Sequence, residues 1–424
     1  MFVIILASTI FVIGYALIAF AEYLHINKTA VALATGSVLW LIVALLGNKE
    51  ALDGLPEASS DVFAIVVFLL IAMSIVEILV HYHFFDVVRG KLFSLHLDEK
   101  KQFLLIVFIS FFLSAMLDNL TTTIVMIQIA RRFFKDKNLL LAGVGIVIAA
   151  NAGGAFSPIG DVTTIMLWFA NKYTAMEILS RGFLPAITLQ VVSMGLLYLK
   201  LETGTASFPE ETVEKLSLSE KTILGLALFA FTLPLVVSYV NVPPYIGLMF
   251  GLSILWLAID TFKRTAPNET HLSADIETII KKVDISVLKF FIGILLAVSA
   301  LHSLGALELL ANWMYGATPT TMSIVIGHTG LGLLSALVDN VPLTAIAIKM
   351  LAISNPSYWV LLALTVGTGG SILVIGSAAG VMSLSMLEKQ GMTFWKYAEL
   401  AAVPAMVGYF AGIGVWYVQY LLIG

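Results

Sequence analysis

Long apolar runs separated by short polar segments dominate the pattern of this chain. A bilayer core of about 30 Å needs roughly 20 helical residues to be crossed, and runs of that length recur. We expect membrane-spanning helices over residues 1–20, 29–47, 61–80, 182–200, 220–240, 243–262, 284–302 and 400–422. The first run has no basic start and no small-residue cleavage site behind it, so we expect a retained span rather than a signal peptide.

Four other apolar regions are interrupted. Region 102–133 contains LDNLTTT and region 320–352 contains VDNVPLT, and most of the arms on either side are too short to span comfortably. We therefore expect two re-entrant helical hairpins with Asp-Asn at their tips. Regions 139–170 and 357–386 contain NAGGAFSPIGD and GTGGSILVIGS. Each of these is predicted to be one span made of two half-helices.

The order of these elements occurs twice along the chain. SAMLDNLTTTI aligns with SALVDNVPLTAI, and NAGGAFSPIGDV aligns with GTGGSILVIGSA at nearly the same offset. Two motifs in the same order indicate an internal duplication. We divide the chain into a first repeat (1–200), a cytoplasmic linker (201–219) and a second repeat (220–424). Each repeat has five spans, one of them broken, plus a hairpin. Because five is odd, the second repeat is inverted, which is the plan of many secondary transporters.

Composition supports an all-α polytopic membrane protein. The chain is 59% hydrophobic and 12% charged, whereas soluble domains are near 45–50% apolar and about 25% charged. The net charge of −4 gives no case for nucleic-acid binding. The absence of cysteine excludes disulfides and thiolate metal sites. There is no Walker motif, so we expect no nucleotide, and we expect no cofactor. Short loops argue against an enzyme or a receptor with an extramembrane domain.

Basic residues are distributed unequally between the two sides of this topology. Most of the 23 Lys and Arg residues fall in loops on one side, which the positive-inside rule assigns to the cytoplasm. Both termini are then outside, the first hairpin opens from the cytoplasm, and the second opens from the exterior. We expect the plasma (inner) membrane of a prokaryote.

Acidic residues deep in the apolar regions are the main candidates for chemistry, because burying charge in a membrane is costly. Asp118 and Asp339 lie at the two hairpin tips, and Asp161 lies in the first broken span. Each could simply cap a helix, which is compatible with ion binding. Two equivalent Asp-Asn tips, with hydroxyls and helix-end carbonyls nearby, supply the oxygen ligands that hard cations prefer.

Glu77 and His81 share a helix face at a spacing of four residues. His titrates near neutral pH, so this pair could sense pH. Ordinary interfacial polarity is the alternative.

At its four motifs the chain resembles the NhaD-type Na⁺/H⁺ antiporters of the ion transporter superfamily, and the resemblance covers nearly the whole chain. It implies a homodimer, with the early spans of each half as scaffold and the later elements as transport core. Val374 stands where the family pattern would have a second hydroxyl. The resemblance implies ion or proton binding at Asp118, Asn119, Asn151, Asp161, Thr163, Thr164, Asp339, Asn340 and Ser371.

The expected function is exchange of cytoplasmic Na⁺ or Li⁺ for external H⁺, driven by the proton gradient. The cation and protons would compete for Asp118, Asp161 and Asp339. Because Asp161 aligns with Ser377 in the second repeat, we expect the site to lie toward the first broken span. The alternative is an anion transporter of the same fold, either an arsenite exporter or a Na⁺-coupled dicarboxylate transporter. The dicarboxylate branch typically carries Ser-Asn-Thr at its tips.

Overall fold

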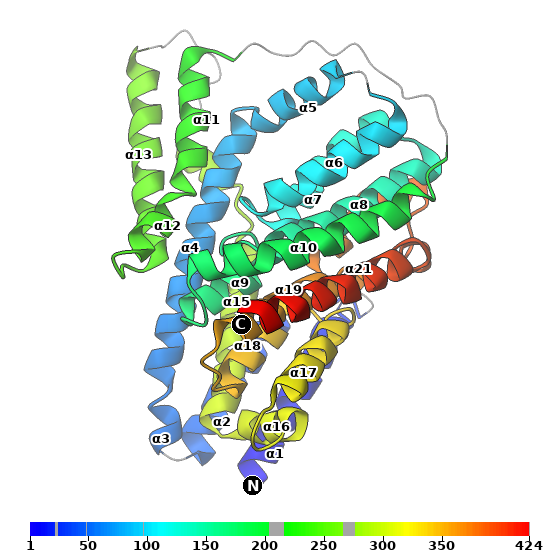
Figure 1. Cartoon of the computed structure of the whole chain (residues 1–424). Helices are drawn as coiled ribbons and strands as arrows, with labels where there is room; N and C mark the ends of the chain where they lie inside the picture. Colours follow the sequence, from blue (N-terminus) through cyan, green and yellow to red (C-terminus); the bar gives the residue numbers. More distant parts are fainter. Residues whose placement is uncertain (22–23, 48, 96, 203–215, 266–275, 424) are drawn as a thin grey trace. The chain divides into compact units, whose positions relative to one another are not determined.

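The computed structural model describes residues 1–21, 24–47, 49–95, 97–202, 216–265 and 276–423, and every regular element in them is a helix (Figure 1). Most of the expected linker, residues 203–215, lies outside the described residues. Its last two residues already belong to a helix that begins at Leu218.

The expected spans correspond to helices. In the described residues, nine helical segments are long and apolar enough to cross a membrane, and the protein is therefore a polytopic membrane protein. The helices at the expected spans are α1 (Phe2–Ala19), α2 (Lys28–Leu46), α4 (Leu55–His81), α10 (Ala175–Tyr198), α11 (Leu218–Ala230), α12 (Leu233–Ser238), α13 (Pro244–Thr265), α15 (Ile285–Ser303) and α21 (Phe394–Ile423).

One expected span is divided in two. The sequence predicts a continuous helix over 220–240, whereas the structure has α11 and α12 separated at Phe231 and Thr232. Pro234 lies at the start of α12. Proline has no backbone N–H and its ring clashes with the preceding turn, so it is favoured at a helix start and is less common inside a helix, as it is in α10 and α21.

The chain folds into two compact units, each of which takes one segment from each half. The first unit comprises Met1–Ser94 and Glu211–Leu307, and the second comprises Leu95–Glu210 and Glu308–Gly424. This division separates the early spans of each half from the hairpins and broken spans that follow them. It coincides with the division that the resemblance implies.

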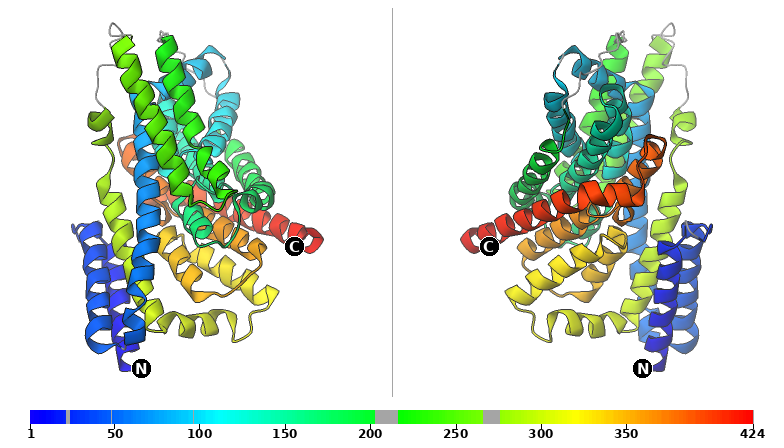
Figure 2. Two further views of the ribbon diagram at one scale, coloured as in Figure 1. Left: turned by 90° about the vertical axis from the view of Figure 1, so that its left-hand side faces the viewer. Right: turned by 90° about the vertical axis from the view of Figure 1, so that its right-hand side faces the viewer.

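In the first unit, α2 packs along α15, and α15 also packs on α4. Gly36 and Gly293 allow the close approach of α2 and α15, since a Cβ on Gly36 would lie 2.5 Å from the Gly293 carbonyl oxygen. Trp40 Nε1 donates to the Leu296 carbonyl at 2.9 Å across the same contact. Figure 2 shows α1 beside α2. The short helices of this unit are α3 (Lys49–Leu52), α5 (Phe84–Ser94) and α14 (Ile276–Ile280).

The second unit contains all four interrupted regions. Its remaining helices are α6 (Glu99–Ser114), α7 (Asn119–Phe133), α8 (Asp136–Ala155), α9 (Val162–Phe169), α17 (Thr321–Leu334), α18 (Asn340–Met350), α19 (Pro356–Gly369), η2 (Val374–Gly376), α20 (Ala378–Leu387) and η3 (Glu388–Gln390), and α16 (Ala306–Tyr315) runs across the boundary between the units.

The hairpin arms are short, as expected. The helices α6, α7, α17 and α18 have 16, 15, 14 and 11 residues, and none of them is long enough to count as a span. Both α6 and α7 pack on α8, and both α17 and α18 pack on α19. One arm of each hairpin also packs on the broken span of the other half: α7 packs on α20, and α18 packs on α9. α10 and α21 lie side by side (Figure 1).

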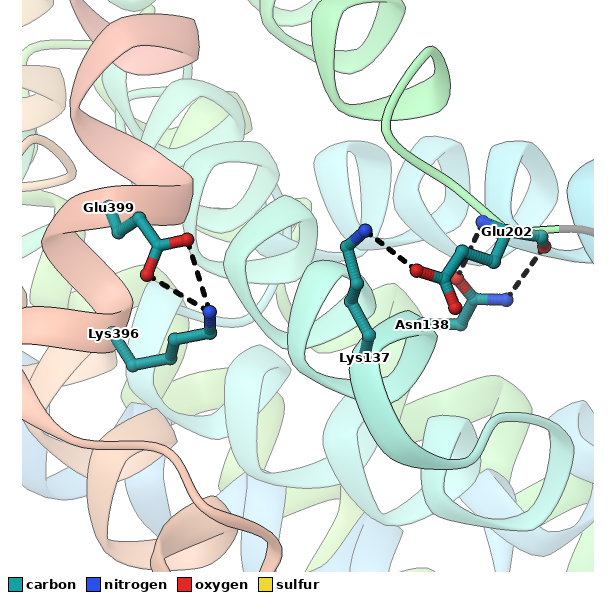
Figure 3. A network of polar contacts seen from close by, with 5 residues as sticks. All are labelled: Lys137, Asn138, Glu202, Lys396 and Glu399. Carbon is teal, nitrogen blue, oxygen red and sulfur yellow. Dashed lines mark hydrogen bonds and ion pairs between the residues drawn. The ribbon is translucent and has the colours of Figure 1, made fainter.

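Hydrogen bonds fix the end of the second unit where α8 begins. Lys137 Nζ lies 2.8 Å from Glu202 Oε1, and the Asn138 amide exchanges two hydrogen bonds with the Glu202 backbone (Figure 3). Asp98 caps the start of α6, and the hydrogen bond from the Lys101 side chain holds the pKa of Asp98 below its ordinary value. The starts of α6 and α8 are therefore tied down by local polar contacts.

Equivalent contacts recur in the two halves of this unit. The Ser114 hydroxyl donates to the Ala150 carbonyl at 2.6 Å, and the corresponding Ser335 hydroxyl donates to the Val366 carbonyl at 2.8 Å. Each bond joins the end of a hairpin arm to a broken span.

The glycine pairs serve close packing. A Cβ on Gly153 would collide with the Phe111 carbonyl, and one on Gly369 would collide with the Gly332 carbonyl. In the first broken span, α8 continues through the glycine pair to Ala155, so the interruption is confined to 156–161. The glycines therefore bring each hairpin arm against a half-helix, and the break follows them.

This packing predicts the effect of adding one methyl group. Gly153→Ala and Gly369→Ala should each lower the free energy of unfolding by about 1–3 kcal/mol, because the backbones must move apart. Gly195→Ala in α10 is the matched control, since its Cβ would meet nothing within 4 Å. It should leave stability unchanged or slightly raised. Thermal unfolding of the detergent-purified variants, followed by tryptophan fluorescence, measures this. Wild-type melting of Gly153→Ala would contradict the packing.

Candidate ion site

A buried carboxylate lies where the first broken span resumes. Asp161 caps α9, and its Oδ1 accepts hydrogen bonds of 2.9 Å from both the backbone N–H and the hydroxyl of Thr163. The Asp161 residue is 2% exposed. An Asp at this position satisfies the first N–H groups of α9, which would otherwise be unpaired.

Both hairpin tips meet this carboxylate. The Asn119 side-chain amide at the start of α7 donates to Asp161 Oδ2 at 2.7 Å. The Asn340 amide at the start of α18 donates to the two carboxylate oxygens at 3.3 and 3.4 Å. Asn119 and Asn340 follow the two Asp residues of the aligned tips. One carboxylate therefore collects an equivalent amide from each hairpin.

Asn151 connects the two broken spans. Its Oδ1 accepts from the Asn119 amide at 3.1 Å. Its own amide donates to the Ser371 hydroxyl at 2.9 Å and to the Ser377 hydroxyl at 3.1 Å. Asn151 has no exposed surface. Ser377, which takes the place of Asp161 in the second half, is thus joined to the same network through Asn151.

Two tyrosines that the sequence analysis did not single out donate hydrogen bonds to backbone carbonyls of this network. The Thr164 hydroxyl donates to the Asp161 backbone carbonyl at 2.8 Å, and Tyr173 donates to the Thr164 carbonyl at 3.0 Å. Tyr397 donates to the Ser371 carbonyl at 3.1 Å. Neither tyrosine belongs to one of the four motifs, and no local pattern in the sequence distinguishes them from interfacial anchors.

The tip carboxylates act as helix caps. Asp118 Oδ1 accepts from the Thr121 backbone N–H at 2.7 Å, and Asp339 Oδ1 accepts from the Val341 N–H at 3.5 Å. Both residues are half-buried. The capping interpretation is confirmed for both.

Four helix starts meet at this network. Asn119 and Asn340 begin α7 and α18, while Asp161 and Ser377 cap α9 and α20. The N-terminal end of a helix carries a partial positive charge, which favours a negative group. No described Lys, Arg or His forms an ion pair with Asp161. Helix-start dipoles, the Asn119 and Asn340 amides and the Thr163 backbone N–H and hydroxyl therefore stabilise the Asp161 carboxylate.

Carboxylates are sparse in this site. In the part of the chain that the structure describes, no three His, Asp or Glu residues gather closely enough to hold a metal ion together. The three aspartates predicted as ligands therefore do not form one all-carboxylate cluster. A cation here would take most of its oxygens from amides, hydroxyls and backbone carbonyls around Asp161. Val374, which stands in place of a hydroxyl, is a buried apolar residue in η2.

The candidate pH-sensing residues belong to the other unit. Glu77 and His81 lie half-buried near the end of α4, in the first unit, whereas the predicted ion-site residues all lie in the second. The His81 ring meets the Tyr82 ring edge to face at 5.0 Å.

Comparison with known proteins places the chain in a family. The sequence profile of the citrate transporter family matches residues 15–369. Sodium/proton antiporter 1 of Arabidopsis thaliana is 36% identical over 96% of this chain and 71% of its own length. Sodium/proton antiporter 2 of the same plant is 35% identical over 96% and 97%. The Na⁺/H⁺ antiporter NhaD of Alkalimonas amylolytica is 31% identical over 96% and 88%.

These matches extend through both halves of the chain, including the two hairpin tips and both broken spans. The chain therefore belongs to the citrate transporter family, and within it to the NhaD-type Na⁺/H⁺ antiporters.

Proposed function

We propose that the chain exchanges cytoplasmic Na⁺ or Li⁺ for external H⁺, with Asp161 as the group that binds either one. The observation that carries this proposal is the convergence of Asn119 and Asn340, from two separate hairpins, on this one buried carboxylate. The names of the relatives support the choice of ions.

The coupling between cation and proton movement follows from the need to neutralise the buried charge of Asp161. A carboxylate deep in a protein is costly unless a proton, a cation or hydrogen bonds neutralise it. A proton on Asp161 occupies an oxygen that a cation would use, so each weakens the binding of the other. The amides of Asn119, Asn151 and Asn340 and the hydroxyls of Thr163, Ser371 and Ser377 add neutral oxygens. Exchange then needs no nucleotide.

Asp118 and Asp339 contribute negative charge next to the two tip amides. Each caps the start of its own helix through Oδ1. We propose that these charges attract the cation and share proton binding with Asp161.

An anion transporter is the competing function, and the name of the family favours it. In such a protein, the helix starts around the site would hold the substrate anion. Here the Asp161 carboxylate already lies at the helix starts, and no described cationic side chain pairs with it. A second anion would meet charge repulsion, so cation binding fits the site better.

The topology is part of the proposal. The paired bonds of Ser114 and Ser335 support two repeats of one design, 1–200 and 220–424, and the odd number of spans in each makes them inverted. The excess of basic residues on one side supports both termini outside, in a prokaryotic plasma membrane. We also propose a homodimer, and a pH-sensing role for Glu77 and His81.

Everted vesicles test the exchange and the role of Asp161 together. Adding Na⁺ or Li⁺ should collapse a proton gradient reported by a pH-sensitive dye. Asp161→Asn should abolish this response, because an amide still caps α9 but cannot exchange a proton. Ser377→Ala should raise the apparent KM for Na⁺ at most several-fold. Normal exchange by Asp161→Asn, or greater damage in Ser377→Ala, would place the exchanging group elsewhere. A wild-type response to citrate or arsenite alone would favour the anion transporter.

A conservative substitution separates the negative charge of the tip aspartates from their role as helix caps. Asp118→Asn and Asp339→Asn retain a good helix cap while removing the charge. Both variants should fold and insert at wild-type levels but lose most Na⁺-driven proton movement in the same vesicles. If either variant exchanges at the wild-type rate, that aspartate is only a cap.

A further inference from the structure

Three buried hydroxyls near the site lack hydrogen-bond partners. Thr122, Thr123 and Ser383 have no exposed surface, and no described residue pairs with their hydroxyl oxygens. Other hydroxyls in this unit bond to the preceding turn of their helix, as Ser110 does to the Ile106 carbonyl and Thr344 to the Asn340 carbonyl. A buried hydroxyl without a partner destabilises the fold, so these three need an explanation.

The unpaired hydroxyls belong to two helices, α7 and α20, which pack on each other and on α8. Thr122 and Thr123 lie three and four residues after Asn119, near the start of α7. Ser383 lies on α20, which packs against both α7 and α8. Its hydroxyl faces α8, since a Cβ on Gly143 would lie 3.4 Å from it. We call the space between these three helices the α7–α8–α20 seam.

The seam leads from the site toward the basic end of the unit. Gly143 precedes Asn151 by eight residues of α8, which is about 12 Å along a helix. Beyond it lies the start of α8 with Lys137, which pairs with Glu202 (Figure 3). α7 ends at the same side with Arg131 and Arg132. The positive-inside rule assigns such an end to the cytoplasm.

The second half does not repeat this feature. Leu343 and Leu167 occupy the aligned positions of Thr122 and Ser383. Thr344 aligns with Thr123, but its hydroxyl is paired. The unpaired hydroxyls are therefore confined to one side of the site.

We propose that the α7–α8–α20 seam is the path by which Na⁺ and water reach Asp161 from the cytoplasm, with Thr122, Thr123 and Ser383 as its lining ligands. A hydroxyl without a protein partner can bond to water or to a dehydrating cation, whereas the leucines of the other half cannot. The path rests on the proposed exchange function, but its opening to water can be measured without transport.

Substitutions that remove the three unpaired hydroxyls with little change in side-chain shape should preserve or raise stability while they weaken transport. Thr122→Val, Thr123→Val and Ser383→Ala each remove an unpaired polar group, so the melting temperature should stay the same or rise. The apparent KM for Na⁺ added to everted vesicles should rise several-fold. Ser193→Ala is the matched control, because the buried Ser193 hydroxyl is paired with the Pro404 carbonyl at 2.9 Å. It should melt at a lower temperature with an unchanged KM.

Because the chain has no cysteine, single cysteines report the opening of the seam directly. Ser383→Cys should react with a membrane-impermeant cationic thiol reagent applied to the cytoplasmic face, and Na⁺ should slow the reaction. Ser193→Cys should not react. An unreactive Ser383→Cys, together with wild-type KM values in the hydroxyl variants, would overturn the path. If the wild type showed no exchange but Ser383→Cys reacted and Na⁺ protected it, the path would stand and the exchange function would fall.

Discussion

The Asp161 carboxylate is buried at the meeting point of four helix starts, and the arrangement of the second unit follows from the need to stabilise it. Its hydrogen bonds come from Thr163 and from the amides of Asn119 and Asn340. An interior of low dielectric makes each of these bonds strong and makes the loss of any one costly. Helices that crossed the membrane without interruption would offer no free N–H groups at this depth, so the hairpin tips and broken spans are what make a buried carboxylate possible.

Close backbone contacts hold these interruptions in place. Gly153 and Gly369 let the hairpin arms α6 and α17 touch the half-helices that precede the breaks. Ser114 and Ser335 then each bond to a carbonyl of the facing half-helix. In a membrane, where apolar burial does not drive helices together, small residues and hydrogen bonds of this kind supply much of the specificity of packing. The glycines and serines therefore determine where the tip amides lie relative to Asp161.

The sequence predicted much of this arrangement. The hydropathy and length of each apolar run predicted the spans and the short hairpin arms, because these features depend on local composition. The two Asp-Asn tips and Asp161 stood out because ionisable residues are rare in apolar segments. The division of the span at 220–240 could have been anticipated from Pro234. The links from Tyr173 and Tyr397 could not, since they join backbone positions that only the fold brings near. The roles of Asn119 and Asn340 as partners of one carboxylate also depend on tertiary packing.

The most direct test of competition at Asp161 is proton release on cation binding. Detergent-purified protein in weakly buffered solution is mixed with NaCl, and a pH-sensitive dye reports released protons; choline chloride is the control. The account predicts proton release by the wild type that saturates with Na⁺, and none by Asp161→Asn. Proton release by Asp161→Asn equal to that of the wild type, or saturable Na⁺ binding by the wild type without any proton release, would contradict it.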